Sequence, residues 1–443
     1  MLPLFLLFGI CLAHPKIIYL NDIATGNATY HSGIKANSNL YIASSDNVEL
    51  LKNITIIIGE EITLDKLLNR KNADGSEQPW IIGKTLGLKT TNSMEAQQNL
   101  TGFLYITTPK QAADEDFSVF VISDSINITR SSNLSTTVIL NTFYGLTDYW
   151  YSPFKTSYVS NIVQDKSARI YLHSDYPSDD YNARDPAWKS IFINPYVMED
   201  IDENSTIHAT DVFFDNIEPL QLSFDYWYML SSGKTSMTIE KKWVNNITYQ
   251  TTGKTTTGLI TNGDDGLFPN FKVNFIYEST HNRTTGFAFA GTPTSDIQVT
   301  ISSTTNAIQA DIIANDSIDG LDEYSPNDAT SLFINSSQIF AGKFGLQYFV
   351  IDGISVYTQT SGPSTVSTTV SQPTTTTTTV QTTTTTTATA TTTTVGISVY
   401  PRTIRSSTVS TTTPTVQTTT SDSSNPRMFY LIHFALLYLL TML

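Results

Sequence analysis

Apolar and polar residues alternate over short segments throughout residues 15–358 of the chain. The alternating segments are rich in Ile, Val, Phe, Tyr and Thr, and clusters of Asn, Asp, Gly and Ser separate them. A period of two places successive side chains on opposite faces of an extended chain, and the separating residues favour turns. The clearest segments are residues 40–43, 103–107, 117–122, 170–173, 272–277, 297–301 and 347–351. The pattern predicts an all-β body built of antiparallel sheets.

One short segment departs from this alternation and predicts a helix. Leu64, Leu67 and Leu68 have the spacing of one apolar helix face, and Thr63 before them is a suitable N-cap. The Asn-Ala-Asp-Gly sequence at residues 72–75 ends the segment, because these residue types favour turns. We therefore expect little helix in the body.

A repeated pattern indicates two similar domains. Residues 101–109 and 285–293 share the pattern T-G-F-x-aromatic-x-x-T-P, and an alternating segment follows each copy, at 117–123 and 297–303. The same order in both halves predicts equivalent hairpins late in two related β-sandwiches, with a boundary near residues 148–166. The alternative is a chance match, since the chain is rich in Thr.

The two ends of the chain indicate export and membrane attachment. Residues 1–12 are apolar, and the small residues that follow predict a signal peptide, residues 1–13, cleaved after Ala13. The single cysteine, Cys11, lies in this segment, so the mature chain is expected to have neither disulfides nor thiol chemistry.

The apolar tail at residues 428–443 has 16 residues and no Lys or Arg after it. A membrane-spanning helix needs about 20 apolar residues. The tail therefore favours a signal that is replaced by a glycosylphosphatidylinositol (GPI) anchor, with Ser421 or Ser423 as the attachment residue and the outer face of the plasma membrane as the location. The alternatives are a plain tail-anchored span and a tail without function.

Between the body and the tail, 41 of the 65 residues from 360 to 424 are Ser or Thr. A segment with so few large apolar residues cannot bury enough surface to offset the entropy of ordering. With its scattered prolines it predicts a disordered, mucin-like, O-glycosylated stalk at residues 359–424. The alternative is an unmodified flexible linker.

The body contains ten Asn-X-Ser/Thr sequons, which are acceptors for N-glycosylation in a secreted chain. Several of them fall at the ends of expected strands, where an attached glycan would reach water. The predicted acceptors are Asn27, Asn53, Asn99, Asn127, Asn133, Asn204, Asn246, Asn282, Asn315 and Asn335.

Charge restricts the partners. The chain has 40 Asp and Glu against 25 Lys and Arg, a net charge of −15, and the stalk and tail contribute little of it. An acidic body repels phosphates at long range, which argues against nucleic acid and against adsorption to anionic lipid. Glycans or cell-surface proteins remain as expected partners, with the membrane reached through the lipid anchor.

No motif points to catalysis or to a bound metal. The six histidines are scattered, and there is neither an H-E-x-x-H nor a G-x-S-x-G sequence nor a glycine-rich phosphate loop. We therefore predict no catalytic residue, no metal ligand and no cofactor. Two alternatives stay open: a glycan hydrolase that uses two carboxylates, and weak calcium binding in the acidic segments at residues 199–203, 262–266 and 319–323.

Two copies of Asp-Tyr-Trp-Tyr, at residues 148–151 and 225–228, are the best candidates for a binding surface. Trp150 and Trp227 are able to stack on sugars, as aromatic rings do at binding surfaces. In a strand, however, Trp227 faces away from its two neighbouring tyrosines, so one face belongs to a core. Packing is the favoured interpretation, and ligand binding is the alternative.

The F-L-Y-I-T-T-P sequence at residues 103–109 and the F-S-V-x-V sequence at 117–121, with the signal peptide, Thr-rich stalk and anchor tail, resemble nematode secreted CUB-like proteins. The resemblance covers residues 17–125 and 167–357. It implies CUB-like or jelly-roll sandwiches on a surface protein of epithelial cells, associated with innate immunity or stress and without catalysis. CUB domains usually carry disulfides, which this chain lacks, and their calcium-binding carboxylates are not identifiable, so no site residue is transferred.

These observations predict a membrane-anchored extracellular glycoprotein that displays its body for binding, adhesion or shielding. A carbohydrate-binding, lectin-like module is the alternative, and an anchored glycan hydrolase is the third. The expected order is a signal peptide, two β-sandwich domains, a stalk and an anchor signal, at residues 1–13, 14–150, 160–358, 359–424 and 428–443.

Overall fold

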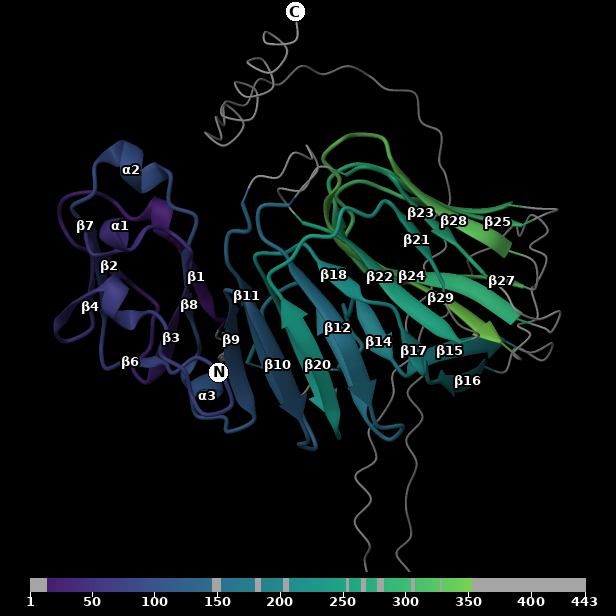
Figure 1. Ribbon diagram of the computed structural model, residues 1–443, viewed down its shortest axis with the longest axis horizontal. Helices are drawn as coiled ribbons and strands as arrows, with labels where there is room; N and C mark the ends of the chain where they lie inside the picture. Colours follow the sequence, from purple (N-terminus) through teal and green to yellow (C-terminus); the bar gives the residue numbers. More distant parts are fainter. Residues whose placement is uncertain are drawn as a thin grey trace, which may run out of the picture. The chain divides into compact units, whose positions relative to one another are not determined.

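A computed structural model describes the β body of the chain (Figure 1). These residues form strands joined by turns and a few short helices, so the predicted all-β class is confirmed. The described residues are 14–145, 153–179, 185–201, 207–251, 255–263, 268–276, 283–303, 307–326 and 329–352. The predicted signal peptide, stalk and anchor signal lie outside them.

The α-helices of the described part are one turn long and begin at capping side chains. Asn47, Ser93 and Thr108 each accept a hydrogen bond from a backbone N–H of the first turn. This bond satisfies a donor that has no partner within the helix. The helices are α1 (Val48–Leu51), α2 (Met94–Gln98) and α3 (Pro109–Ala112).

The helix expected after Thr63 needs a correction. The segment is a single 3-10 turn, η2 (Leu64–Leu67), and the Thr63 side chain makes no capping hydrogen bond. Leu64 and Leu67 are buried, and the backbone is extended again at Leu68. The spacing of the leucines therefore reflects two side chains that enter one core. A single 3-10 turn places them there as well as a helix would.

The first double-sheet unit, sandwich 1, has two four-stranded sheets. One has the order β1 (Lys16–Tyr19), β8 (Phe103–Ile106), β3 (Ser38–Ala43) and β6 (Trp80–Ile82); the other has the order β2 (Thr29–His31), β7 (Leu86–Thr90), β4 (Ile54–Ile57) and β5 (Glu61–Thr63). Leu104 and Ile106 of the first sheet share a buried core with Ile56 and Leu88 of the second.

Sandwich 2 follows it along the chain. Its outer sheet has the order β10 (Ser125–Arg130), β20 (Thr235–Glu240), β12 (Ser157–Gln164) and β18 (Leu220–Leu222). Its inner sheet has the order β14 (Phe192–Asn194), β13 (Arg169–His173), β19 (Tyr226–Ser232), β11 (Ser135–Asn141) and β9 (Phe117–Ile122). Trp227 and Met229 of the inner sheet pack with Ile239 of the outer sheet.

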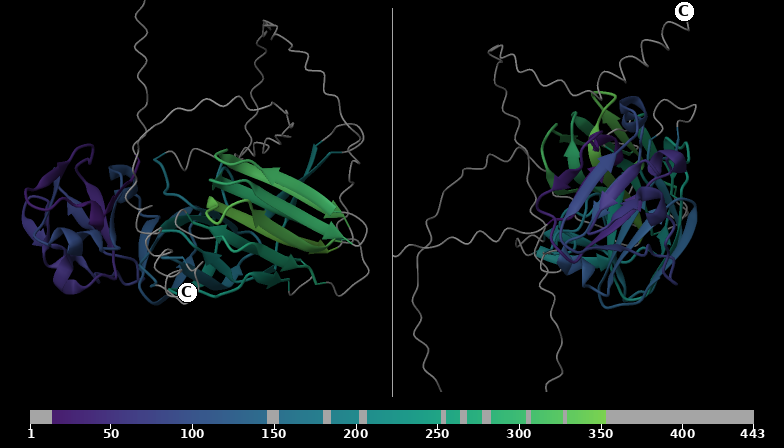
Figure 2. Two further views of the ribbon diagram at one scale, coloured as in Figure 1. Left: turned by 90° about the horizontal axis from the view of Figure 1, so that it is seen from above. Right: turned by 90° about the vertical axis from the view of Figure 1, so that its left-hand side faces the viewer.

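Sandwich 3 completes the body (Figures 1 and 2). One sheet has the order β17 (Asn216–Ile217), β22 (Thr256–Asn262), β29 (Gly342–Asp352), β24 (Arg283–Pro293) and β27 (Ile318–Pro326). The other has the order β21 (Thr248–Gln250), β23 (Phe271–Asn274), β28 (Ala329–Ser336), β25 (Ile297–Ser303) and β26 (Ala307–Ile312). Phe287 and Leu346 pack with Val299 and Leu332 between the sheets.

The strand pairing groups the chain differently from the expected two sandwiches. The expected boundary at residues 148–166 does not separate paired strands, because β10 and β11 before it pair with β20 and β19 after it. The expected hairpins do not form either: β8 pairs with β1 and β3, whereas β9 pairs with β11. Likewise β24 pairs with β27 and β29, and β25 with β26 and β28. Alternation indicates that a strand has a buried face, but it does not identify the strand's partner.

Sandwiches 1 and 2 share a further core, here called the shared core. Phe103 and Tyr105 of β8 point away from the sandwich 1 core and pack with Val119 and Val138 of the inner sheet of sandwich 2. Successive residues of β8 therefore enter two different cores, as the twofold periodicity of a strand requires. Both faces of these strands are buried, which explains their nearly continuous apolar sequences.

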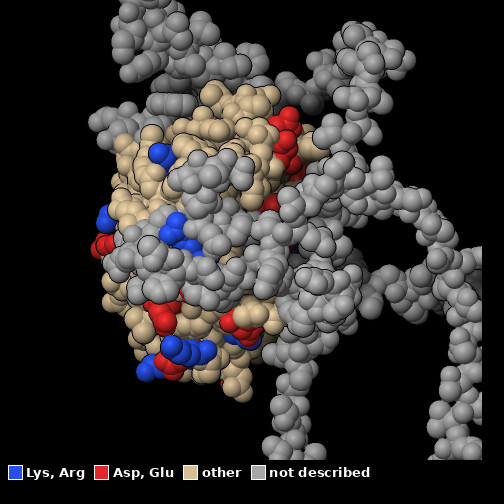
Figure 3. Space-filling model, turned by 90° about the vertical axis from the view of Figure 1, so that its right-hand side faces the viewer, with Lys and Arg blue, Asp and Glu red and all other residues tan. Residues whose placement is uncertain are grey.

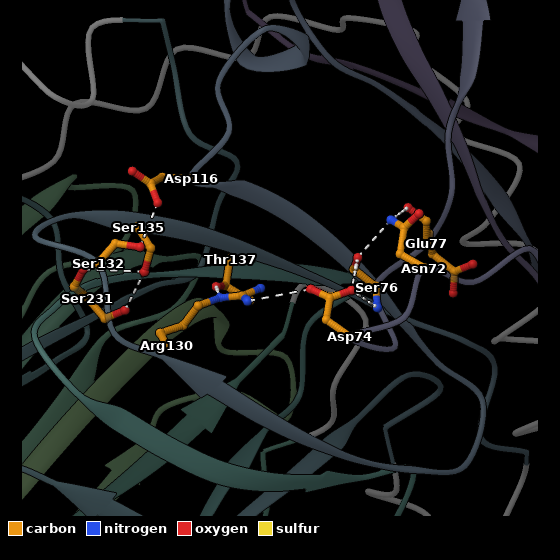
Figure 4. A network of polar contacts seen from close by, with 10 residues as sticks. All are labelled: Asn72, Asp74, Ser76, Glu77, Asp116, Arg130, Ser132, Ser135, Thr137 and Ser231. Atoms are coloured by element: carbon orange, nitrogen blue, oxygen red, sulfur yellow. Dashed lines mark hydrogen bonds and ion pairs between the residues drawn. The ribbon is translucent and has the colours of Figure 1, made fainter.

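A polar network lies beside the shared core and joins a loop of sandwich 1 to strand β10 (Figure 4). Arg130 Nε donates to Thr137 Oγ1 at 2.9 Å, and its guanidinium lies 3.8 Å from the carboxylate of Asp74. Burial alone would raise the pKa of Asp74, but hydrogen bonds from Ser76 and the charge of Arg130 lower it overall. Burial raises the pKa of Glu77 in the same loop.

Sandwiches 2 and 3 join through polar as well as apolar contacts. The buried Gln347 side chain accepts from the backbone N–H of Ile193 and donates to its carbonyl, both at 2.9 Å. Gly345 lies so close to Ile191 that a β-carbon there would be 2.5 Å from the isoleucine. The hairpin of β15 (Tyr196–Ile201) and β16 (Ile207–Val212) covers part of the same sheet, where the ring of Tyr196 meets that of Phe349. Sandwiches 2 and 3 are therefore closely packed and hydrogen-bonded where they meet.

Candidate functional site

A cleft of about 460 Å³ opens beside this contact. Strands β13 and β19 of sandwich 2 form one side, strands β24, β27 and β29 of sandwich 3 form the other, and the chain following β13 completes it. A second hollow, where Leu40 and Trp80 of sandwich 1 meet Val121 of sandwich 2, measures only about 30 Å³. That is close to the space of one or two water molecules. The larger cleft is the one with room for a ligand.

Aromatic rings form one wall of the cleft. The rings of His173 and Tyr228 are stacked, with centroids 4.4 Å apart and planes inclined by 8°. The ring of Tyr176, which also lines the cleft, lies 6.3 Å from that of His14 and 5.8 Å from that of Tyr226, which is not itself a lining residue. Both tyrosines of β19 and Tyr176 also pack against the shared core. The wall is therefore anchored in the packing between sandwiches 1 and 2.

Trp188 presents a further aromatic side chain to the cleft and is 42% exposed. Two tandem turns hold it there: Trp188 N donates to the carbonyl of Asp185 at 3.0 Å, and Ser190 N donates to that of Ala187 at 3.1 Å. Lys189 has a positive φ of 58°, an uncommon conformation for a residue with a side chain. Such conformations cluster at functional sites, where the surrounding structure maintains them.

Charged side chains line the cleft in both signs. The ammonium of Lys343 lies 5.2 Å from the ring centroid of Tyr226, and that of Lys189 lies 4.8 Å from that of Trp188. Lys189 also lies 3.5 Å from the carboxylate of Asp319 and donates to Ser317 Oγ at 3.4 Å. Asp175 is a further charged lining residue. Burial, and secondarily the charge of Asp175, raises the pKa of the Tyr176 hydroxyl above its ordinary value, and at neutral pH the hydroxyl is a hydrogen-bond donor in either case.

This combination fits a polar, ring-shaped ligand. Aromatic faces cover the apolar side of a sugar, while ammonium, carboxylate and hydroxyl groups bond its hydroxyls. Among the described residues visible in Figure 3, most side chains are uncharged; acidic side chains gather at the upper right, and acidic and basic side chains lie together lower down.

For Trp227 the structure agrees with the favoured interpretation, packing, and excludes the alternative of ligand binding. Trp227 is 0% exposed, and its Nε1 donates to Ser157 Oγ at 3.0 Å inside sandwich 2. It is therefore a core residue, and its neighbours Tyr226 and Tyr228 point to the opposite face, as strand alternation predicts. Trp150 lies outside the described residues.

The cleft itself was not predicted from the sequence. His173 is one of six scattered histidines, and Trp188, Lys189 and Lys343 belong to no sequence motif. The turn-forming pair Asp185-Pro186, which Ala187 separates from Trp188, is the one local signal of an aromatic residue displayed in a loop.

The described sequon asparagines have the accessibility that glycosylation requires. Seven of them are exposed and Asn246 is half-buried; the exposed ones are Asn27, Asn53, Asn99, Asn127, Asn133, Asn315 and Asn335. Asn204 and Asn282 lie outside the described residues, as do Ser421 and Ser423. Glycosylation at these positions stays a prediction.

Metal sites and membrane spans were searched over the described residues alone. There, no three His, Cys, Asp or Glu side chains lie close enough together to hold a metal ion. Of the acidic segments, 319–323 lies on β27, and the other two extend beyond the described residues. Within the described part, no helix has the length and apolar character needed to span a bilayer.

Comparison with known proteins gives one extended match. A family model described as transmembrane glycoprotein matches residues 35–403. No curated protein matches the chain.

Solved structures give only weak similarity. The CUB1-EGF-CUB2 domains of rat MASP-1 match with 8% identity over 52% of this chain and 98% of that one, at a TM-score of 0.17. Dimeric latent PorU from Porphyromonas gingivalis matches with 10% identity over 46% of this chain and 25% of that one, at a TM-score of 0.14. The fold is therefore described from its own strand pairing.

Proposed function

Because the chain belongs to the transmembrane glycoprotein family, we propose that it is a cell-surface glycoprotein that binds saccharides in the cleft between sandwiches 2 and 3. The observation that carries the proposal is the juxtaposition of exposed Trp188 and the tyrosine wall with the cations of Lys189 and Lys343. Such a lining recognises a sugar by ring stacking and by hydrogen bonds together. Binding in the cleft makes the body a receptor or adhesin; shielding alone requires no cleft.

The test is an array of host and microbial glycans, probed with the full-length protein purified from membranes. We expect binding that is lost in Trp188→Ala and retained in Tyr30→Ala. Tyr30 is a matched control because it is a 61% exposed aromatic residue on β2, in sandwich 1. Binding to microbial glycans would also support the defence role that the CUB-like resemblance implies. Equal binding by both variants, or no binding to any glycan, contradicts the proposal.

The mode of membrane attachment is a separate part of the proposal. A signal peptide at residues 1–13, a glycosylated stalk at 359–424 and an apolar tail at 428–443 support export and anchoring. We propose a GPI anchor at Ser421 or Ser423. A phosphatidylinositol-specific phospholipase should then release the protein from intact cells. Retention after treatment favours a tail-anchored span, which agrees with the family's description.

A glycan hydrolase is the second candidate, because two carboxylates, those of Asp175 and Asp185, line the cleft. Each accepts a hydrogen bond from a backbone N–H of its own loop at 2.9 Å, from Tyr176 and Ala187 respectively. These bonds assign both carboxylates to holding the loop, which favours binding without catalysis. Release of reducing ends from a bound oligosaccharide, abolished in Asp175→Asn or Asp185→Asn, would establish the enzyme instead.

A further inference from the structure

A sequon lies at the rim of the cleft. Asn315, Asp316 and Ser317 form it, and Ser317 lines the cleft and accepts the hydrogen bond from Lys189. Among the described sequons, this is the only one that contributes a residue to the cleft lining. The remaining seven lie elsewhere on the three sandwiches.

The local structure fixes where a glycan on Asn315 begins. The side chain is exposed, and the backbone N–H of Asn315 donates to the carbonyl of Pro293 at 2.7 Å. Thr292 and Thr294, on either side of that proline, line the cleft, as does Ser317 two residues beyond the asparagine. The acceptor asparagine is thus held between two segments that form the cleft.

Trp188 is an exposed aromatic platform for the first sugars. Its sequence neighbour Lys189 bonds Ser317 of the sequon, so the tryptophan loop and the sequon loop are directly connected. An N-glycan begins with N-acetylglucosamine, whose apolar ring face and acetyl methyl group pack on aromatic rings. Ile313, two residues before the acceptor in the sequence, is 54% exposed and is a further exposed apolar side chain.

We propose that the N-glycan at Asn315 folds back onto Trp188 and occupies the cleft, where it competes with external saccharides. The packing of the glycan stands by itself, whereas its regulatory effect rests on the proposed saccharide binding. A protein glycosylated at Asn315 binds external glycans weakly, and one without this glycan binds them strongly.

The first test measures the packing. The full-length protein from glycosylating cells is treated under native conditions with peptide-N-glycosidase, and release is followed site by site by mass spectrometry. We expect release at Asn315 about five-fold slower than at Asn335, the factor that a ring contact of about 1 kcal/mol gives. Trp188→Ala should remove the difference. Equal rates in the wild type, or an Asn315 that carries no glycan, overturn the proposal.

The second test measures the regulation. Asn315→Gln should raise binding on the glycan array by the same factor, while Asn335→Gln leaves it unchanged. Unchanged binding in Asn315→Gln, with wild-type binding present, overturns the competition. If protection at Asn315 depends on Trp188 but no array glycan binds to any variant, the packing stands and the proposed function fails. The two failures are therefore distinguishable.

Discussion

The body has two junctions, one between sandwiches 1 and 2 and one between sandwiches 2 and 3. Both are built from similar sheets, but the first is closed and the second leaves a cleft. Between sandwiches 1 and 2, strands such as β8 and β19 supply apolar side chains on both faces, and the shared core leaves only a hollow of about 30 Å³. Between sandwiches 2 and 3, the contact through Gln347 and Gly345 is tight, but beside it a turn-rich loop leaves a cleft of about 460 Å³. Continuous apolar strands close a junction, whereas polar loops at its edge leave room for a ligand.

The two junctions are also connected. The ring of Phe103 in the shared core lies 6.1 Å from that of Tyr226, which in turn lies 5.8 Å from that of Tyr176 at the cleft. The packed junction therefore supports the aromatic wall of the open one. Four substitutions test the difference between the closed junction of sandwiches 1 and 2 and the open junction of sandwiches 2 and 3.

The largest effect is expected in the shared core. Phe103→Ala removes a fully buried ring, which costs about 3–5 kcal/mol for a phenylalanine in a packed core. Because Tyr226 loses a neighbour, saccharide binding should weaken as well. Chemical denaturation and the glycan array measure the two effects. A loss below about 1 kcal/mol would mean that the shared core is not packed as described.

At the other junction, Gly345→Ala should destabilise the protein by about 1–3 kcal/mol, because the new β-carbon overlaps Ile191. Gly83→Ala is the matched control: no atom lies within 4 Å of its added β-carbon, and the expected change is within about 0.5 kcal/mol. Urea denaturation of both variants gives the comparison. Equal stabilities would show that sandwiches 2 and 3 are not in tight contact at this point.

The polar network beside the shared core predicts a smaller effect, a pH dependence of the unfolding free energy. Burial raises the pKa of Glu77 in the folded protein, so the folded state binds this proton more tightly than the unfolded state. The contribution of Glu77 to stability is therefore greatest below its unfolded pKa, near 4.3, and declines as the pH rises through its folded value. Asp74, whose pKa is lowered, has the opposite sign.

Glu77→Gln should remove this decline. The difference in unfolding free energy between wild type and Glu77→Gln, measured from pH 4 upward, should fall with pH and then level off. A difference that increases over the same range contradicts the burial of Glu77. Asp74→Asn serves as the control of opposite slope.

The smallest effect on stability is expected at the cleft. Trp188→Ala changes an exposed side chain, and its unfolding free energy should stay within about 0.5 kcal/mol of the wild type. The same substitution should abolish saccharide binding. Thermal or chemical denaturation beside the glycan array separates the two properties. A large loss of stability would make Trp188 a structural residue instead of a binding one.

The sequence predicted the strands better than their partners. Residues 103–106 and 117–122 are strands as expected, but in each strand the apolar residues of the two faces belong to two different cores, which a single alternating pattern does not reveal. The boundary at residues 148–166 failed for a related reason, since β11 finds its partner β19 almost a hundred residues later. Strand pairing depends on such distant contacts.

The residues that line the cleft are even farther apart along the chain. His173 and Lys343 line it together although 170 residues separate them, and no periodicity links them. The sequence correctly marked Tyr226 to Tyr228 as alternating, and it identified the sequon at Asn315. It did not indicate that Tyr228 and Ser317 of the sequon line one cleft, because that follows from how sandwich 3 packs on sandwich 2.

The most direct test of the central claim is the comparison of wild type, Trp188→Ala and Tyr30→Ala on one glycan array, with the stability of each variant measured in parallel. The account predicts that all three proteins are equally stable and that only Trp188→Ala loses binding. Binding that survives in Trp188→Ala, or that is lost equally in Tyr30→Ala, would show that the cleft between sandwiches 2 and 3 is not the saccharide-binding site.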